Sequence, residues 1–133
     1  MAAALDTNVI LRFLLQDDPM QSAAATRLIQ QAKDTGEALH VPVSVALELE
    51  WVLRSRFKLG KPALLQTFAA LLQTLELEFE AEGALEWALS EFENSSADFS
   101  DCIHAALAWQ AGRQPLWTFD KAASALQGAK LLL

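Results

Sequence analysis

Short apolar segments alternate with longer segments of helical periodicity along the chain, and this alternation limits the fold more than any other sequence feature. Gly, Pro and Asp residues separate the two kinds of segment. Expected strands are residues 2–5, 38–41, 75–79, 116–118 and 130–133; expected helices are residues 8–16, 19–34, 42–57, 62–74, 81–93 and 97–111, with a short helix after Asp120. Strands that alternate with helices predict an α/β fold with three α/β/α layers and a short, mostly parallel central sheet.

The length of 133 residues and the hydrophobic fraction of 53% predict a single domain, residues 1–133, with one core. No apolar run reaches the roughly 18–20 residues that a membrane span needs. Residues 1–5 carry no basic side chain, which argues against a cleaved signal. Cys102 is the single cysteine, so an internal disulfide is excluded, and we expect a protein of the reducing cytoplasm.

The charge balance is acidic, with 17 Asp and Glu against 10 Lys and Arg and a formal net charge of −7. Taken alone, this balance argues against binding of nucleic acid, because phosphate contacts usually come from basic patches. The objection loses its force if many of the carboxylates hold cations. The positions of the acidic residues therefore decide between these interpretations.

Two aspartates follow expected strands directly. Asp6 follows an apolar opening and precedes a helix, and Asp120 follows residues 116–119, with the hydroxyl of Thr118 two positions before it. In parallel sheets, ligands bind beyond the carboxyl ends of the strands, which is where these aspartates are expected. The structural alternative is that each aspartate caps the following helix. Thr7 offers a second cap for the first helix, which would leave Asp6 available for other chemistry.

Glu48 and Glu50 lie two positions apart in an expected helix. The neighbours of Glu48 at helical spacing are Ser44, Val45, Trp51 and Val52. This mostly apolar face predicts a buried carboxylate that needs a partner or a metal. The alternative is that Glu48 lies at the edge of the apolar stripe and reaches water. Glu50 is spaced to pair with Arg54, and we expect it to be an ordinary surface residue.

Asp98 and Asp101 are three positions apart, which places both on one face in the first turns of the helix expected over residues 97–111. Acidic residues are favoured there because they compensate the helix dipole. One aspartate would satisfy the dipole, whereas two on one face repel each other. A cation between the two carboxylates is therefore plausible.

Taken together, the acids occupy several positions expected to face one edge of a single sheet. Carboxylate oxygens are the ligands that Mg²⁺ and Mn²⁺ prefer. Such a cluster can activate water and neutralise charge on a phosphate, which reconciles the acidic composition with a nucleic-acid substrate.

Other candidate groups favour simpler interpretations. His40 and His104 lack a Cys or second His at ligand spacing, so a zinc site is not expected, and His104 is interpreted as a packed or surface residue. A solvated helix end is the default interpretation of the one basic cluster; contact with RNA phosphates is the alternative. The members of this cluster are Arg54, Arg56, Lys58 and Lys61.

These segments resemble a known family. The matching segments are residues 5–15 (Leu-Asp-Thr-Asn-Val-Ile-Leu-Arg-Phe-Leu-Leu), 17–19 (Asp-Asp-Pro), 48–54 (Glu-Leu-Glu-Trp-Val-Leu-Arg), 98–101 (Asp-Phe-Ser-Asp) leading into 105–108, and 118–120 (Thr-Phe-Asp). In their order and separation they resemble the PIN-domain family, and within it the VapC-type toxins of bacterial toxin–antitoxin pairs. The resemblance covers nearly the whole chain.

The resemblance implies an endoribonuclease that uses Mg²⁺ or Mn²⁺ and is neutralised by a cognate VapB-type antitoxin. It implies that Asp6, Glu48, Asp101 and Asp120 form the catalytic acidic pocket, and that Asp98 is a further metal ligand. Thr7, Asn8 and Thr118 match small polar positions that would orient ligands or water. Similar proteins form homodimers, and their antitoxins place an amphipathic segment, often with an arginine, near the carboxylates.

Three other functions stay open at this point. A haloacid-dehalogenase-like phosphatase also begins with an aspartate after a strand, but its chemistry needs a second aspartate where this chain has Asn8. A PIN-like domain without catalysis would act as a binding module. A PIN-domain ribonuclease could also serve RNA processing outside a toxin–antitoxin pair, which a neighbouring antitoxin gene would decide.

Overall fold

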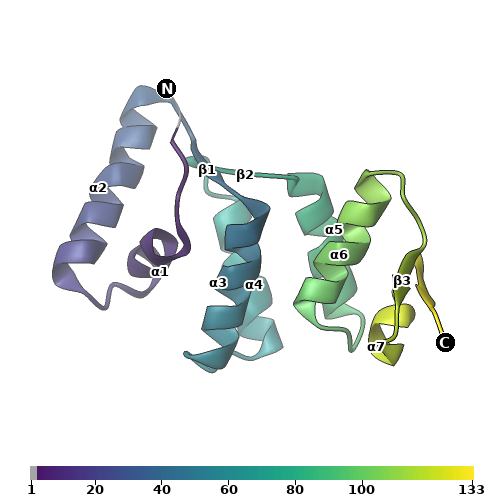
Figure 1. The fold of residues 1–133 in the computed structure, drawn as a ribbon. Coiled ribbons are helices and arrows are strands. Elements are labelled where there is room, and N and C mark those ends of the chain that lie inside the picture. The colour runs from purple at the N-terminus through teal and green to yellow at the C-terminus, as the bar shows by residue number, and fades with distance from the viewer. Residues whose placement is uncertain (1–2) are drawn as a thin grey trace. The chain divides into compact units, whose positions relative to one another are not determined.

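The computed structural model describes residues 3–133 and divides the chain into two compact units, Met1–Glu80 and Ala81–Leu133. We call them the N-terminal unit and the C-terminal unit. The described residues form seven helices and four short strands, with one or two helices before each strand. Figure 1 shows their arrangement. All strand pairs are parallel within this part of the chain. The predicted α/β class with short parallel strands is confirmed.

The N-terminal unit contains four helices and two strands. They are α1 (Thr7–Leu15), α2 (Pro19–Thr35), β1 (Leu39–Val41), α3 (Val43–Ser55), α4 (Lys61–Leu72) and β2 (Leu77–Phe79). Strand β1 pairs with β2 in parallel, with Leu39 opposite Leu77. Residues 3–5 run parallel to β1 through an isolated bridge between Ala4 and His40. The predicted first strand is thus an isolated bridge, and its first residue, Ala2, lies outside the described residues.

Capping residues fix both ends of α2, and a hydrogen bond joins it to α1. Asp18 accepts hydrogen bonds from the backbone N–H groups at the start of α2, Pro19 stands at the first helical position, and Gly36 ends the helix with a φ of 74°. The hydroxyl of the buried Ser22 donates to the carbonyl oxygen of Arg12 at 2.7 Å, which joins α2 to α1. The helix start and stop predicted from Asp18, Pro19 and Gly36 are confirmed.

The core of the N-terminal unit is aliphatic, with one large aromatic residue. Leu11, Leu49 and Phe68, from three helices, are each at most 2% exposed, and Val41 of β1 is fully buried. Burial of a side chain of this size stabilises a fold by about 1.5–3 kcal/mol. This packing fixes the positions of α1 and α3, and with them the polar residues at the start of α1 and in the middle of α3.

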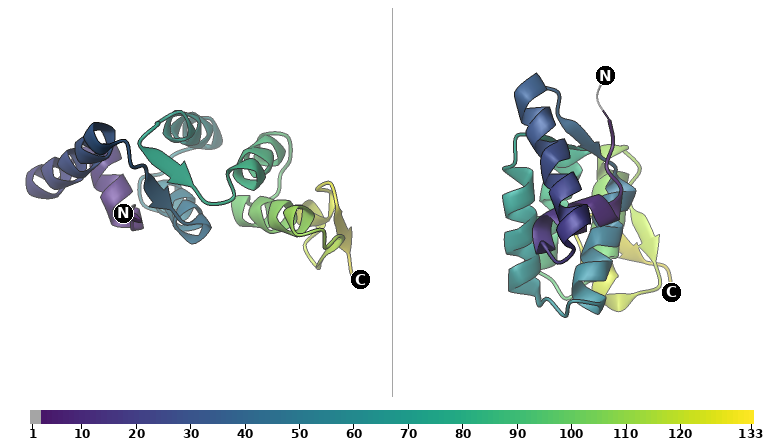
Figure 2. Two further views of the ribbon diagram at one scale, coloured as in Figure 1. Left: turned by 90° about the horizontal axis from the view of Figure 1, so that it is seen from above. Right: turned by 90° about the vertical axis from the view of Figure 1, so that its left-hand side faces the viewer.

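The C-terminal unit consists of a helix pair followed by a small α/β segment. Its elements are α5 (Glu82–Glu93), α6 (Phe99–Gln110), β3 (Leu116–Thr118), α7 (Lys121–Ser124) and β4 (Ala129–Leu131). Helices α5 and α6 pack against each other, as the left view of Figure 2 shows. Strand β3 pairs with β4 in parallel, and Trp117 lies opposite Lys130. Helix α6 begins at Phe99, two residues later than predicted, so Asp98 is its N-cap and not part of its first turn.

None of the helices in residues 3–133 combines the length and the apolar character that crossing a membrane would require.

Candidate active site

Asp6 lies between the buried Leu5 and helix α1. Its Oδ1 accepts a hydrogen bond of 2.7 Å from the backbone N–H of Thr7, and its backbone is extended, as for an N-cap. The alternative that Asp6 caps the helix therefore holds. Thr7, which the sequence offered as a second possible cap, is not the cap, because its hydroxyl donates to Glu48. Asp6 is exposed and can still offer carboxylate oxygen to a ligand.

Thr7 connects the start of α1 with the middle of α3. Its side chain is 3% exposed, and its hydroxyl donates a short hydrogen bond to Oε1 of Glu48, 41 positions away in the sequence. The backbone N–H of Thr7 donates to Asp6 and its hydroxyl donates to Glu48, so one residue holds two of the predicted acids. The structure thus gives Thr7 two defined hydrogen-bond partners, Asp6 and Glu48.

The predicted burial of Glu48 is wrong, and so is the predicted exposure of Glu50. Glu48 is exposed, whereas Glu50 is 4% exposed and pairs with Nε of Arg54 at 2.8 Å. Of the helical neighbours of Glu48, Val45 and Val52 are buried, but Ser44 is exposed and Trp51 is 53% exposed. Glu48 thus lies at the edge of the apolar stripe, which was the alternative. The predicted Glu50–Arg54 pair is confirmed.

Asp6, Thr7, Asn8 and Glu48 line one hollow of about 280 Å³ in the N-terminal unit. We call it the acidic hollow. Its remaining lining residues, which the sequence interpretation did not assign to a site, are Leu11, Arg12, Trp51, Val52, Arg56 and Phe57. Trp51 follows Glu48 by three positions, so helical spacing alone was a signal for it.

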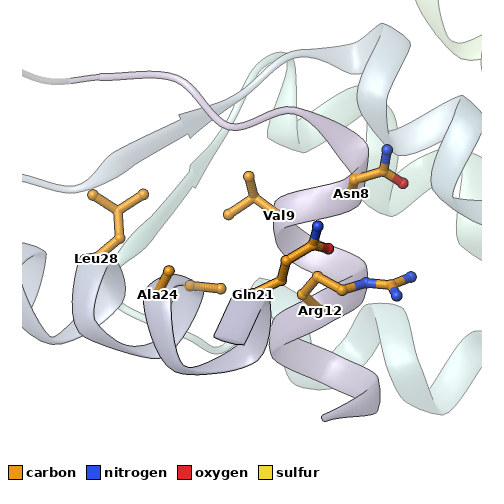
Figure 3. A pocket seen from close by; sticks show the side chains of 7 residues that line it. Asn8, Val9, Arg12, Gln21, Ala24 and Leu28 are labelled. Carbon is orange, nitrogen blue, oxygen red and sulfur yellow. The ribbon is translucent and has the colours of Figure 1, made fainter. Parts of the chain in front are cut away.

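A second hollow of about 330 Å³ lies between α1 and α2 and shares Asn8 and Arg12 with the acidic hollow. Figure 3 shows Val9 on α1 and Ala24 and Leu28 on α2 around this mostly apolar space. The guanidinium of Arg12 pairs with Asp17 at 3.1 Å. Arg12 Nε is buried without a hydrogen-bond partner in the described part of the chain.

The C-terminal unit brings Asp98, Asp101 and Asp120 within electrostatic reach of one another. The pKa of Asp101 is raised first by burial, next by the negative charge of Asp120 and then by that of Asp98, while His104 acts in the opposite direction. These carboxylates come from the start of α6 and from the residue after β3. Asp98 and Asp101 thus lie near each other as predicted, and Asp120 lies near Asp101 as well.

Local hydrogen bonds position Asp120 but not Asp98. Asp120 accepts from the backbone N–H of Ala123 at 2.9 Å and caps α7, and its own N–H donates to the hydroxyl of Thr118 at 3.0 Å. Asp98 occupies the N-cap position of α6, yet its side chain makes no capping hydrogen bond. The capping alternative therefore applies to Asp120, and Thr118 lies beside it as expected.

The donor chemistry of these acids fits a hard divalent cation. Carboxylate and hydroxyl oxygens are ligands of Mg²⁺ and Mn²⁺. The pKa of Asp101 is raised first by burial and next by the negative charges of Asp120 and Asp98, and a bound cation would offset those charges. Within each unit taken by itself, residues 3–133 place no three acidic, histidine or cysteine side chains closely enough to hold a metal.

The sequence was compared with known families and with curated proteins. The family model of the PIN domain matches residues 3–128, which include every acid named above. No curated protein matches the sequence. PIN domains are in general nucleases that use divalent metal ions, and RNA is the implied substrate class.

Proposed function

Because this chain belongs to the PIN-domain family, we propose that it is a metal-dependent endoribonuclease and the VapC-type toxin of a toxin–antitoxin pair. The observation that carries the proposal is the link through Thr7, which holds Asp6 and Glu48 at one hollow. Two acids brought together across 42 positions fit a role in binding a cation better than independent helix capping. The proposal treats residues 1–133 as one PIN domain, supported by a family match that runs through both units.

We propose that the acids act in the hydrolysis of an RNA phosphodiester. The proposed ligands of Mg²⁺ or Mn²⁺ are Asp6, Glu48, Asp98, Asp101 and Asp120. When bound, such an ion lowers the pKa of water and neutralises charge that develops on a phosphate. Thr7 fixes the Glu48 carboxylate by donating to it, and Thr118 fixes the backbone at Asp120 by accepting from it. Asn8 contributes an exposed amide at the rim of the acidic hollow.

The toxin role extends the proposal to partners. We propose a homodimer in the cytoplasm, inhibited by a VapB-type antitoxin that places an arginine near the carboxylates. A guanidinium pairs bidentately with carboxylate and would compete with a cation for the same oxygens. The acidic hollow supports this proposal, because Asp6 and Glu48 offer carboxylates at a surface that a peptide can reach. The single, reduced cysteine fits a cytoplasmic location.

The test is cleavage of single-stranded RNA by the purified protein with Mg²⁺ or Mn²⁺. We expect cleavage that a chelator abolishes and that Asp6→Asn reduces to background. Asp34→Asn is the matched control, since Asp34 is exposed on α2 and lines neither of the two hollows. Cleavage by Asp6→Asn at the wild-type rate would contradict the proposal. RNA binding without cleavage would instead support a binding module.

A further inference from the structure

The acidic hollow carries side chains that the proposed hydrolysis does not use. Trp51 is 53% exposed and Phe57 is 39% exposed, and both line the hollow together with Arg56. We call these three residues the aromatic wall. Trp51 and Phe57 differ from the other exposed aromatic residues in that both line the hollow that also holds Asp6 and Glu48, so their rings are placed where a ligand of the acids would meet them.

The positions of these residues follow from the end of α3. Trp51 lies one helical turn after Glu48, and α3 ends at Ser55, so that Arg56 is its C-cap and Phe57 follows it. Glu48 and Trp51 are therefore carried by one helix whose buried side, including Leu49 and Leu53, is fixed in the core. Because the helix is packed, the position of Trp51 relative to Glu48 is set before any ligand arrives.

Arg56 differs from its neighbouring arginines. Arg54 pairs with Glu50 and Arg12 pairs with Asp17, whereas the described part of the chain shows no ion pair for Arg56. Arg56 lines the acidic hollow, where its guanidinium can pair with an anion. An anion bound there would also lie close to the acids Asp6 and Glu48, which line the same space.

We propose that the aromatic wall binds one nucleotide of the RNA substrate, with the base stacked on Trp51 and a phosphate held by Arg56. This inference rests on the proposed nuclease function and names the substrate-contacting residues of the same site. A ring for the base and a cation for the phosphate match the two chemical parts of a nucleotide. The volume of about 280 Å³ lies near the lower end of the range for small-ligand pockets.

The proposal has a consequence for the form of the substrate. A base can stack on Trp51 only when it has left its own stack, so the wall selects single-stranded RNA or an unpaired loop over a duplex. The stacking contact accepts any base, because every base has a π-face. Phe57 adds an apolar edge to the hollow, which disfavours a hydrated or charged group at that point.

The first experiment detects the contact without cleavage. Adenosine 5′-monophosphate, which contains no phosphodiester, is titrated into the protein with Mg²⁺ while the indole N–H resonances of the four tryptophans are recorded by NMR. The Trp51 resonance is identified by its loss in Trp51→Phe. We expect this resonance to shift with the nucleotide and to shift much less with ribose 5-phosphate, which lacks the base. An unmoved Trp51 resonance would overturn the inference.

The second experiment measures cleavage of single-stranded RNA of mixed sequence. Trp51→Ala should raise KM about tenfold with little change in kcat, because the lost stacking acts equally in the bound and transition states. Trp51→Phe should retain most of the affinity. Trp109→Ala is the matched control, since Trp109 lies in the other unit and is 51% exposed. An unchanged KM in Trp51→Ala, or a change in oligomeric state alone, would overturn the inference.

The third experiment tests the phosphate contact through salt dependence. Each phosphate contact to single-stranded nucleic acid contributes about 0.7 to the slope of log affinity against log salt. Arg56→Gln should reduce the steepness of that slope by about this amount, whereas Arg27→Gln, on the exposed face of α2, should leave it unchanged. Equal slopes for wild type and Arg56→Gln would remove Arg56 from the proposal.

The outcomes separate this inference from the proposed function. Suppose that the wild type cleaves RNA, but AMP does not shift the Trp51 resonance and Trp51→Ala does not change KM. The aromatic wall is then not a substrate site, and the nuclease proposal stands. If the wild type does not cleave RNA while AMP shifts the Trp51 resonance, the nuclease proposal fails and the nucleotide site stands.

Discussion

In the N-terminal unit two acids share the hydrogen-bond donors of Thr7, whereas in the C-terminal unit Asp101 lies close to the like charges of Asp98 and Asp120. The first arrangement is satisfied by the protein itself, because donors offset the negative charge. In the second, burial and then the nearby negative charges raise the pKa of Asp101. The difference indicates that the C-terminal acids gain most from a cation, while the N-terminal acids are already oriented without one.

The largest expected effect tests whether the two sets of acids serve one centre. Asp6→Asn and Asp101→Asn should each lower the rate of RNA cleavage by at least about 100-fold. If both act on one bound phosphodiester, the double variant should be little worse than either single variant, because residues that act as a unit are not additive. The measurement is the cleavage rate with Mn²⁺ of the wild type, the two single variants and the double variant, which together form a double-mutant cycle. Multiplicative losses would mean that the acids work independently.

The next prediction separates the two glutamates of α3. Glu50→Gln should lower the free energy of unfolding by about 1–3 kcal/mol, because the buried carboxylate loses its charged hydrogen bond with Arg54. Glu48→Gln, two positions away and exposed, should change it by less than about 0.5 kcal/mol but abolish cleavage. Urea unfolding and cleavage assays on both variants check this. Equal losses of stability would contradict the observed burial.

A smaller effect is expected at Thr7. Thr7→Val keeps the buried volume but removes the donor to Glu48, and kcat should fall about tenfold because the carboxylate loses its orientation. Thr7→Ser keeps a hydroxyl and should restore most of the rate. If Thr7→Ser is as slow as Thr7→Val, packing of the methyl group, and not the hydrogen bond, is what matters.

The smallest effect is the pH dependence of stability at Asp101. The folded state raises its pKa, so folding favours the protonated carboxyl, and this contribution is lost as the pH rises through the folded pKa. With chelator at neutral pH, Asp101→Asn should therefore melt a few °C higher than wild type at most. The difference should vanish in acid, where wild-type Asp101 is protonated. A lower melting temperature for Asp101→Asn at neutral pH would contradict this.

Added Mg²⁺ or Mn²⁺ should reduce this difference, since a bound cation stabilises the wild type in proportion to its occupancy. Thermal melts of wild type and Asp101→Asn with and without the ion measure it.

Local signals in the sequence were enough to place the elements, because the caps and breakers act on neighbouring residues. Asp18, Pro19 and Gly36 bound α2 as predicted. The exposure of Glu48 and Glu50 was not predictable in the same way. Both have helical neighbours of mixed polarity, and the packing of α3 in the unit decides which side is buried.

The site was predictable in its residue types but not in its connections. The hydrogen bond from Thr7 to Glu48 joins residues 41 positions apart, and no local pattern encodes it. The same holds for the charge of Asp120 at Asp101. The sequence placed Arg56 in a basic cluster together with Arg54. Arg54 lies within α3 and pairs with Glu50, whereas Arg56 is the C-cap, and this difference depends on where α3 ends.

The single cysteine gives the C-terminal unit a built-in chemical reporter. Cys102 is 0% exposed and adjoins Asp101 on α6, so a thiol reagent can reach it only when that helix opens. The rate of labelling then measures how often this segment opens, with no need for an engineered tag. Any ion that tightens the start of α6 will slow the reaction, so the labelling rate reports ion binding at this segment.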